Sequence, residues 1–138
     1  MKFSIKIQYG LQALLELALG YGNAPRQTKE IAKTQKIPLR FLEQLMLLLK
    51  RGELVTSLRG LHGGFTLASH PSEITLLQIV EVLDGPIELA NKKLKKIPVL
   101  FDTFTNVQES IRQHLVSVTL EDLAMRKRQK DRAYIYNI

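Results

Sequence analysis

The chain has 138 residues, 45% of them hydrophobic, which is enough for one folded domain with a hydrophobic core and an extension. It contains no cysteine, which excludes disulfides, thiolate metal sites, cysteine nucleophiles and thiol redox switches. Its formal net charge of +7 favours a polyanionic partner, and residues 1–80 hold ten Lys or Arg and five Asp or Glu, against ten and eight in residues 81–138.

The N-terminal segment predicts an amphipathic helix and no membrane anchor. Apolar residues recur at helical spacing over residues 4–19, and glycines follow. The longest apolar stretch, residues 11–19, contains Gln12 and Glu16 and is shorter than the roughly 18–20 residues that a membrane span needs. No small-residue cleavage site follows it, and we therefore expect a cytoplasmic protein with no membrane partner.

Two short helices joined by a tight turn come next and form a helix-turn-helix pattern. Thr28 is the predicted N-cap of a helix over residues 29–35. The second helix begins at Pro38, where the missing backbone N–H costs nothing in a first turn, and ends at Gly52. Its predicted buried face consists of Leu42, Leu45, Met46 and Leu49.

A change in apolar spacing after the second helix predicts a β-hairpin. Residues 54–59 alternate between two faces, residues 65–67 return as the second strand, and three glycines supply the turn, with Arg59 at the tip. A helix with an exposed polar and basic stripe, followed by such a hairpin, is typical of a winged-helix DNA-binding domain. A structural helix and hairpin with a solvated basic face is the alternative. The stripe consists of Arg40, Gln44 and Arg51, and the glycines are Gly60, Gly63 and Gly64.

The C-terminal part of the chain predicts a short helix and a long one. Thr75 and Gln78 form a capping box for a helix that ends at Asp84, and residues 86–98 are an irregular, lysine-rich connection. A helix over residues 98–117 then carries an apolar stripe that one helix cannot bury alone. We expect this stripe to pack on its own domain or on a second copy in a two-fold dimer.

A further short helix is expected from Thr119, after which the charged end is expected to fray, with Tyr134 and Tyr136 able to dock. The predicted fold class is mainly α with a small β-hairpin. A winged helix-turn-helix DNA-binding domain occupies residues 1–85. Residues 86–138 form a linker loop, a long dimerisation helix and a C-terminal tail.

Several motifs in fixed order resemble the Rrf2 family of bacterial winged-helix transcription regulators. They are FLEQL, LKRGELVTSLRG, GGFTLA and the IT…I…V…G run, and the opening KFSIKIQYGLQALLELA is similar to the first helix of that family. The resemblance is strong over residues 1–86 and looser over the long helix. It implies a homodimer whose long helices cross at the dimer axis. Cluster-binding members carry three cysteines in the loop before that helix, and this chain has none, so iron–sulfur sensing is not carried over.

The resemblance also implies which residues contact double-stranded DNA. The start of the recognition helix would enter the major groove, the wing arginine would reach toward the minor groove, and the first helix would contact the backbone. With the exposed stripe included, the predicted DNA-binding residues are Lys6, Tyr9, Thr28, Arg40, Phe41, Gln44, Arg51, Arg59 and Gly60. The predicted dimer-interface residues are Phe104, Val107, Ile111 and Leu115.

Signals for catalysis or metal binding are weak. The His62-Gly63-Gly64 tripeptide superficially resembles an esterase oxyanion loop, but no G-x-S-x-G nucleophile motif exists in the chain. The three histidines show no metal-ligand spacing. We therefore predict no catalytic residues, no metal and no cofactor, with regulation by a bound small molecule, a partner protein or the abundance of the protein itself.

Two functions remain at this point. The first is a homodimeric DNA-binding transcription regulator that acts as a repressor and is not an enzyme. The second is a winged-helix adaptor that binds a protein partner and no specific DNA, because a fold does not fix a function. Convergence of Arg40, Arg51 and Arg59 on one face would favour DNA. The sequence names neither the operator, nor the regulated genes, nor the signal.

Overall fold

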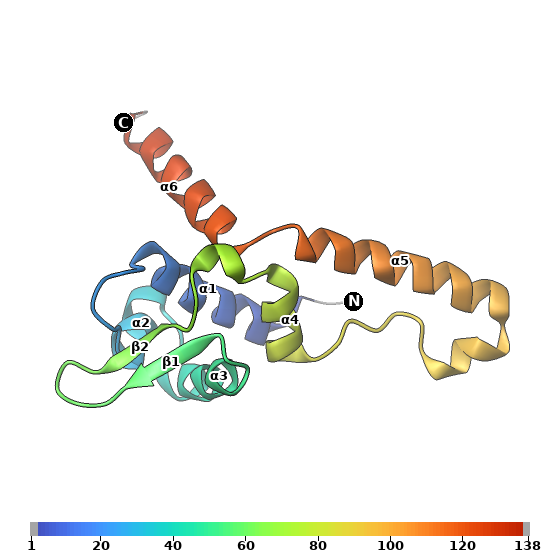
Figure 1. Ribbon diagram of the computed structural model, residues 1–138, viewed down its shortest axis with the longest axis horizontal. Coiled ribbons are helices and arrows are strands. Elements are labelled where there is room, and N and C mark those ends of the chain that lie inside the picture. Colours follow the sequence, from blue (N-terminus) through green and yellow to red (C-terminus); the bar gives the residue numbers. More distant parts are fainter. Residues whose placement is uncertain (1–2, 137–138) are drawn as a thin grey trace.

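The computed structural model describes residues 3–136 and consists of a helical body from which the hairpin, one long helix and the C-terminal helix extend (Figure 1). The hairpin and α5 extend from opposite sides of the body, and α6 points away from α3. The elements are α1 (Ile5–Leu19), α2 (Thr28–Gln35), α3 (Leu39–Arg51), β1 (Val55–Leu58), β2 (Gly64–Leu67), η1 (Pro71–Glu73), α4 (Leu76–Asp84), η2 (Lys92–Lys96), α5 (Pro98–Val116) and α6 (Leu120–Tyr136).

The core lies where α1, α2, α3, α4 and the start of α6 meet. Each of these helices contributes at least one side chain that is fully buried, because its apolar residues recur at helical spacing and form one face. The start of α6 therefore packs against residues 1–85, although it belongs to residues 86–138. The division at residue 85 stays a prediction. The fully buried side chains include Leu14, Ile31, Leu42, Leu49, Ile79 and Leu120.

The starts of the helices differ in how they are capped. The Ile7 N–H donates to Ser4 Oγ at the start of α1, and Thr75 and Gln78 form the predicted capping box of α4. No side chain caps α2 or α3, whose N-cap residues are Gln27 and Pro38. The prediction that Thr28 is a cap is wrong, because the chain is extended at Gln27 and enters the helix one residue earlier.

Backbone hydrogen bonds join the hairpin to the loop before α2. β1 and β2 pair antiparallel from Val55 opposite Leu67 to Leu58 opposite Gly64. The Phe65 N–H donates to the Arg26 carbonyl at 2.8 Å, and the Arg26 N–H donates to the Phe65 carbonyl at 3.0 Å. Gly64 is required at this crossing, because a Cβ there would lie 2.5 Å from the Arg26 carbonyl oxygen and its φ is +147°.

The C-terminal segment is helical where a frayed tail was expected. α6 continues to Tyr136, so the prediction of a short helix and a fraying end is wrong. The segment contains neither Gly nor Pro, and Lys127 pairs with Asp131 one turn later at 2.9 Å. Tyr134 and Tyr136 do not dock on the chain, since they are 71% and 88% exposed.

The predicted start of this helix is confirmed by reciprocal hydrogen bonds. The Thr119 N–H donates to Asp122 Oδ2 at 2.9 Å, and the Asp122 N–H donates to Thr119 Oγ1 at 3.1 Å. Hydrogen bonds to the Asp122 carboxyl from the Thr119 backbone, and from its side chain, hold the pKa of that carboxyl below its ordinary value. Over residues 3–136, none of the helices has both the length and the apolar character needed to cross a membrane.

Candidate DNA-binding surface

Helix α3 presents one buried face and one exposed polar stripe. Leu42, Leu45, Met46 and Leu49 are buried against the core, which fixes the rotation of the helix about its axis. Arg40, Gln44 and Arg51 are exposed. At 3.6 residues per turn they lie within about 40° of one another around the helix, so they form one outward stripe.

The stripe also contains a residue that the sequence analysis did not include. Leu47 is 50% exposed, although leucine is an apolar residue type that is ordinarily assigned to the buried face of a helix. It lies seven residues after Arg40, which is two helical turns, and this spacing is the signal that could have identified it. An apolar side chain on this stripe suits contact with a thymine methyl group.

The arginines predicted to contact DNA are not neutralised by nearby carboxylates. Among the ion pairs formed within residues 3–136, none involves Arg40, Arg51 or Arg59. The first N–H groups of α3 also lack a side-chain cap, because Pro38 precedes them. A positive helix end with free N–H groups favours an anion such as phosphate.

Two of the predicted contacts have a structural role. The rings of Tyr9 and Phe41 are half-buried and meet edge to face, with centroids 5.6 Å apart. This contact holds α1 against the start of α3. Lys6 lies on the exposed side of α1 one turn earlier. Contact of these residues with DNA stays a prediction.

Residues 59–62, at the tip of the hairpin, are exposed. Arg59 follows the last paired residue of β1, and Gly60 has a φ of +113°, which favours glycine. The Gly63 N–H donates to the Gly60 carbonyl at 3.0 Å and closes the turn. Leu61 at the tip is 86% exposed, so the tip combines a cation with an apolar side chain.

Arg26 positions the hairpin, and the sequence analysis missed it. Its guanidinium contacts Glu16 Oε1 at 2.9 Å and Glu30 Oε2 at 3.3 Å, while its backbone pairs with Phe65. It therefore joins α1, α2 and β2. The spacing of four between Arg26 and Glu30 was visible in the sequence, but the contact with Glu16 depends on how α1 packs.

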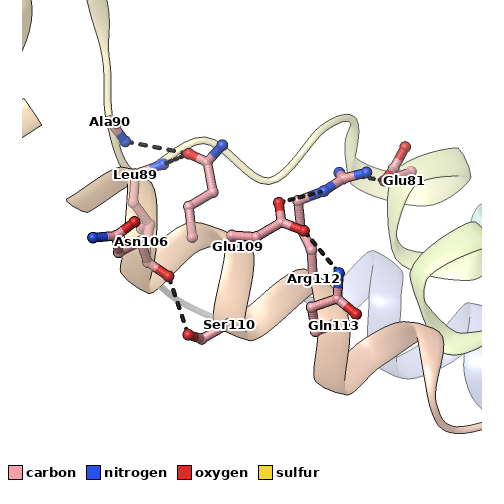
Figure 2. A network of polar contacts seen from close by, with 9 residues as sticks. Glu81, Leu89, Ala90, Asn106, Glu109, Ser110, Arg112 and Gln113 are labelled. Atoms are coloured by element: carbon pink, nitrogen blue, oxygen red, sulfur yellow. Dashed lines mark hydrogen bonds and ion pairs between the residues drawn. The ribbon is translucent and has the colours of Figure 1, made fainter. Parts of the chain in front are cut away.

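Helix α5 is anchored to the body through its polar side. Gln108 Oε1 accepts the Leu89 N–H at 2.7 Å and the Ala90 N–H at 3.3 Å, and Arg112 contacts Glu81 at 2.8 Å (Figure 2). No side chain of α5 is buried. Of the predicted interface residues, Phe104 and Val107 are exposed, whereas Ile111 and Leu115 are half-buried.

The connection between α4 and α5 does not fit an iron–sulfur cluster. Such clusters are held mainly by cysteine thiolates, and residues 86–97 contain neither cysteine nor histidine. Within residues 3–136, no three or more His, Cys, Asp or Glu side chains gather in a way that could hold a metal ion. Glu88 is the one acidic residue of that connection.

Comparison with known proteins agrees with this geometry. The family model Rrf2, described as "Iron-dependent Transcriptional regulator", matches residues 3–126. The transcriptional regulator CymR of Bacillus subtilis is 37% identical over 138 residues, covering all of both chains. The solved structure of B. subtilis CymR matches with a TM-score of 0.75 over 91% of this chain and 98% of that chain. The structure of IscR of T. potens matches with a TM-score of 0.76 at 35% identity, over 92% and 88%.

Proposed function

This chain belongs to the Rrf2 family of DNA-binding transcription regulators, and we propose that it is a homodimeric repressor that reads the major groove with α3 and the minor groove with the hairpin. The family consists of transcription regulators, so the chain is not an enzyme. The observation that carries the proposal is the outward stripe of α3, whose arginines have no carboxylate partner within residues 3–136.

The chemistry of the stripe supports base recognition. Arginine pairs with guanine through two hydrogen bonds, and glutamine pairs with adenine in the same way. Arg40 and Gln44 lie in the first turns of α3, the part of a recognition helix that approaches base edges. Arg51 lies at the other end of the helix, where a contact with phosphate is the expected role.

The hairpin tip supports a minor-groove contact. A narrow minor groove has an enhanced negative potential that attracts an arginine. Arg59 is exposed and is followed by Gly60, whose positive φ turns the chain away and leaves room for the duplex. The pairing of Arg26 with Phe65 fixes the direction in which this tip extends from the body.

The unpartnered stripe of α5 supports a dimer. Phe104 and Val107 are 41% and 42% exposed in a single copy, and a second copy crossing the helix would cover them. Two copies related by a two-fold axis would bind two half-sites of an inverted repeat. Occupancy of a promoter is enough for repression, whereas activation needs a further surface for polymerase, so repression is the simpler role.

One relative suggests where the operator should be sought. A structure with 37% identity to this chain is named as the global cysteine regulator of B. subtilis. We extend that role to this chain as a hypothesis, with promoters of cysteine-metabolism genes as the expected targets. Mapping the chromosomal sites bound in the cell tests it, and binding confined to unrelated promoters would contradict it.

Fluorescence anisotropy on labelled duplexes tests the central proposal. We expect tight binding to the mapped operator, weaker binding to random duplex, and a loss of affinity as salt rises, because phosphate contacts release counterions. The protein-interaction adaptor predicts no specific DNA binding. The matched control is Arg132→Ala, which removes a charge on α6, a helix that points away from α3 (Figure 1), and should leave affinity unchanged.

A further inference from the structure

Glu16 is a largely buried carboxylate near the end of α1, and its side chain is only 10% exposed. Its Oε1 atom contacts the Arg26 guanidinium at 2.9 Å. Its Oε2 atom is buried and has no hydrogen-bond partner within residues 3–136. A buried polar atom without a partner lowers the stability of a fold, and such costs are concentrated at functional sites. The DNA contacts proposed above give Glu16 no role.

The Arg26 guanidinium lies between two helices and contacts a carboxylate on each. Nη2 contacts Glu16 on α1 at 2.9 Å, and Nε contacts Glu30 on α2 at 3.3 Å. The Glu30 side chain is 54% exposed, and an exposed ion pair contributes little. Removal of the Glu16 charge would leave Arg26 with only this exposed partner. The position of Arg26 relative to α1 therefore depends on Glu16.

The backbone of Arg26 links this ion pair to the hairpin. Phe65 pairs with Arg26 on one side and with Ser57 of β1 on the other. Of the backbone hydrogen bonds that join the hairpin to the body within residues 3–136, the two between Arg26 and Phe65 lie nearest the tip. Arg59 follows Ser57 by two residues, which is about 7 Å of extended chain. A shift of Arg26 would therefore change the direction of the tip.

We propose that Glu16 is a positioning residue for recognition of the minor groove. Through Arg26 and Phe65, its carboxylate sets the angle at which the hairpin presents Arg59 to DNA. This inference rests on the minor-groove contact proposed above and adds the residue that orients it. A binding group must be held within about 10–20° of its productive direction. A small rotation of the hairpin would thus weaken the contact of Arg59 and leave the contacts of α3 in place.

The test measures flank preference, which we define as the dissociation constant on G·C-rich flanks divided by that on A·T-rich flanks of the mapped operator. Glu16→Gln in the full-length chain keeps the size of the side chain and removes its charge. We expect the dissociation constant on A·T-rich flanks to rise about threefold, with almost no change on G·C-rich flanks. Glu30→Gln is the matched control, because it makes the same chemical change at the exposed partner of Arg26. Its flank preference should equal that of the wild type.

A double variant separates positioning of the hairpin from general stabilisation of the fold. If Glu16 acts through Arg59, Glu16→Gln added to Arg59→Ala should cause no further loss of affinity on A·T-rich flanks. Losses that add in full would overturn the inference, and so would an equal loss from Glu16→Gln on both kinds of flank. In either case Glu16 would have only a structural role.

Amide hydrogen exchange tests the same link without DNA. The Phe65 N–H donates to the Arg26 carbonyl at 2.8 Å, and this amide should exchange faster in Glu16→Gln than in the wild type. The Ile79 amide in the core helix α4 should be unaffected. Faster exchange at both amides, or at neither, would contradict a local effect on the hairpin. Glu16→Asp supplies a second variant, since it keeps the charge and withdraws the carboxylate from Arg26, and it should lower flank preference in the same direction.

Failure of the inference can be distinguished from failure of the proposed function. If Arg59→Ala keeps the flank preference of the wild type, the proposed minor-groove contact fails and the inference fails with it. If Arg59→Ala abolishes the preference, whereas Glu16→Gln and Glu16→Asp retain it in full, the contact stands and only the inference fails.

Discussion

The exposure of Arg40 follows from the burial of the opposite face of α3. Leu42 and Met46 cannot leave the core without exposing apolar surface, so α3 has a single favourable orientation about its axis. This orientation turns Arg40 and Gln44 outward, and Arg40 forms no ion pair within residues 3–136. Their side chains are therefore free to adopt the geometry that a base pair requires.

The first prediction concerns base recognition by Arg40. Arg40→Ala should cost about 1–3 kcal/mol of operator binding and relax specificity at one position in each half-site. Anisotropy titrations on operators with single base-pair changes measure both effects. A uniform loss on every sequence would show that Arg40 contacts phosphate only, and Arg132→Ala supplies the baseline.

The second prediction concerns Arg59 at the hairpin tip. Arg59→Ala should lose more affinity on operators with A·T-rich flanks than on those with G·C-rich flanks, because only the former offer a narrow and strongly negative groove. The measurement is a pair of titrations that differ in the flanks alone. Equal losses would leave Arg59 as an ordinary phosphate contact.

Periodicity in the sequence predicted the exposed stripe of α3, but not the contacts that position it. Leu42, Leu45 and Leu49 are spaced as a helix requires, so the opposite face follows by geometry. The ring contact of Tyr9 with Phe41 and the pairing of Arg26 with Glu16 join residues far apart in the chain. Both depend on how α1 crosses its neighbours, which local patterns do not specify.

At the scale of elements, helices α1 to α5 and the hairpin were predictable within a residue or two, whereas η2 and the length of α6 were not. The helices α1, α3, α4 and α5 have caps, breakers or strong periodicity at their ends. The second half of α6 has no apolar stripe, and a charged end without such a stripe predicts fraying. Helix propensity and ion pairs between neighbouring turns stabilise this half of α6, and the spacing of apolar residues does not report either of them.

The third prediction concerns α5. Ile111→Asp places a charge on the stripe that a second copy would cover, and an unpaired buried charge is strongly unfavourable. We expect dimerisation to fail, and operator binding to fall with it, because two half-sites need two linked domains. Sedimentation and anisotropy measure the two effects.

The control for this variant is Asn106→Asp, which adds the same charge on the exposed polar side of α5. It should leave the dimer intact. Circular dichroism should report the same helix content for both variants. A monomeric wild-type protein at micromolar concentration would contradict the dimer and the role given to this helix.

At the scale of the whole molecule, the chain has no cysteine thiolate with which to hold an iron–sulfur cluster. The fourth prediction is that protein purified without oxygen is colourless, and that its affinity for the operator is unaffected by chelators or by air. Iron and sulfide assays with a visible spectrum measure this. A brown protein with stoichiometric iron and sulfide, whose DNA affinity changed on loss of the cluster, would contradict it.

The uncapped starts of α2 and α3 have a consequence for how far this protein can be stabilised. Gln27→Ser would place a serine three residues before Glu30 and create a capping box, which should raise the free energy of unfolding by about 0.5–2 kcal/mol. The fifth prediction is that this variant melts at a higher temperature and binds its operator several-fold more weakly, because the new cap occupies N–H groups at the start of α2, where Thr28 is a predicted DNA contact. Thermal melts and anisotropy on the same preparation test it, with Gln27→Ala as the uncapped control. Selection for DNA binding would then keep these two helix starts without a capping side chain. The native chain would be less stable than its fold permits.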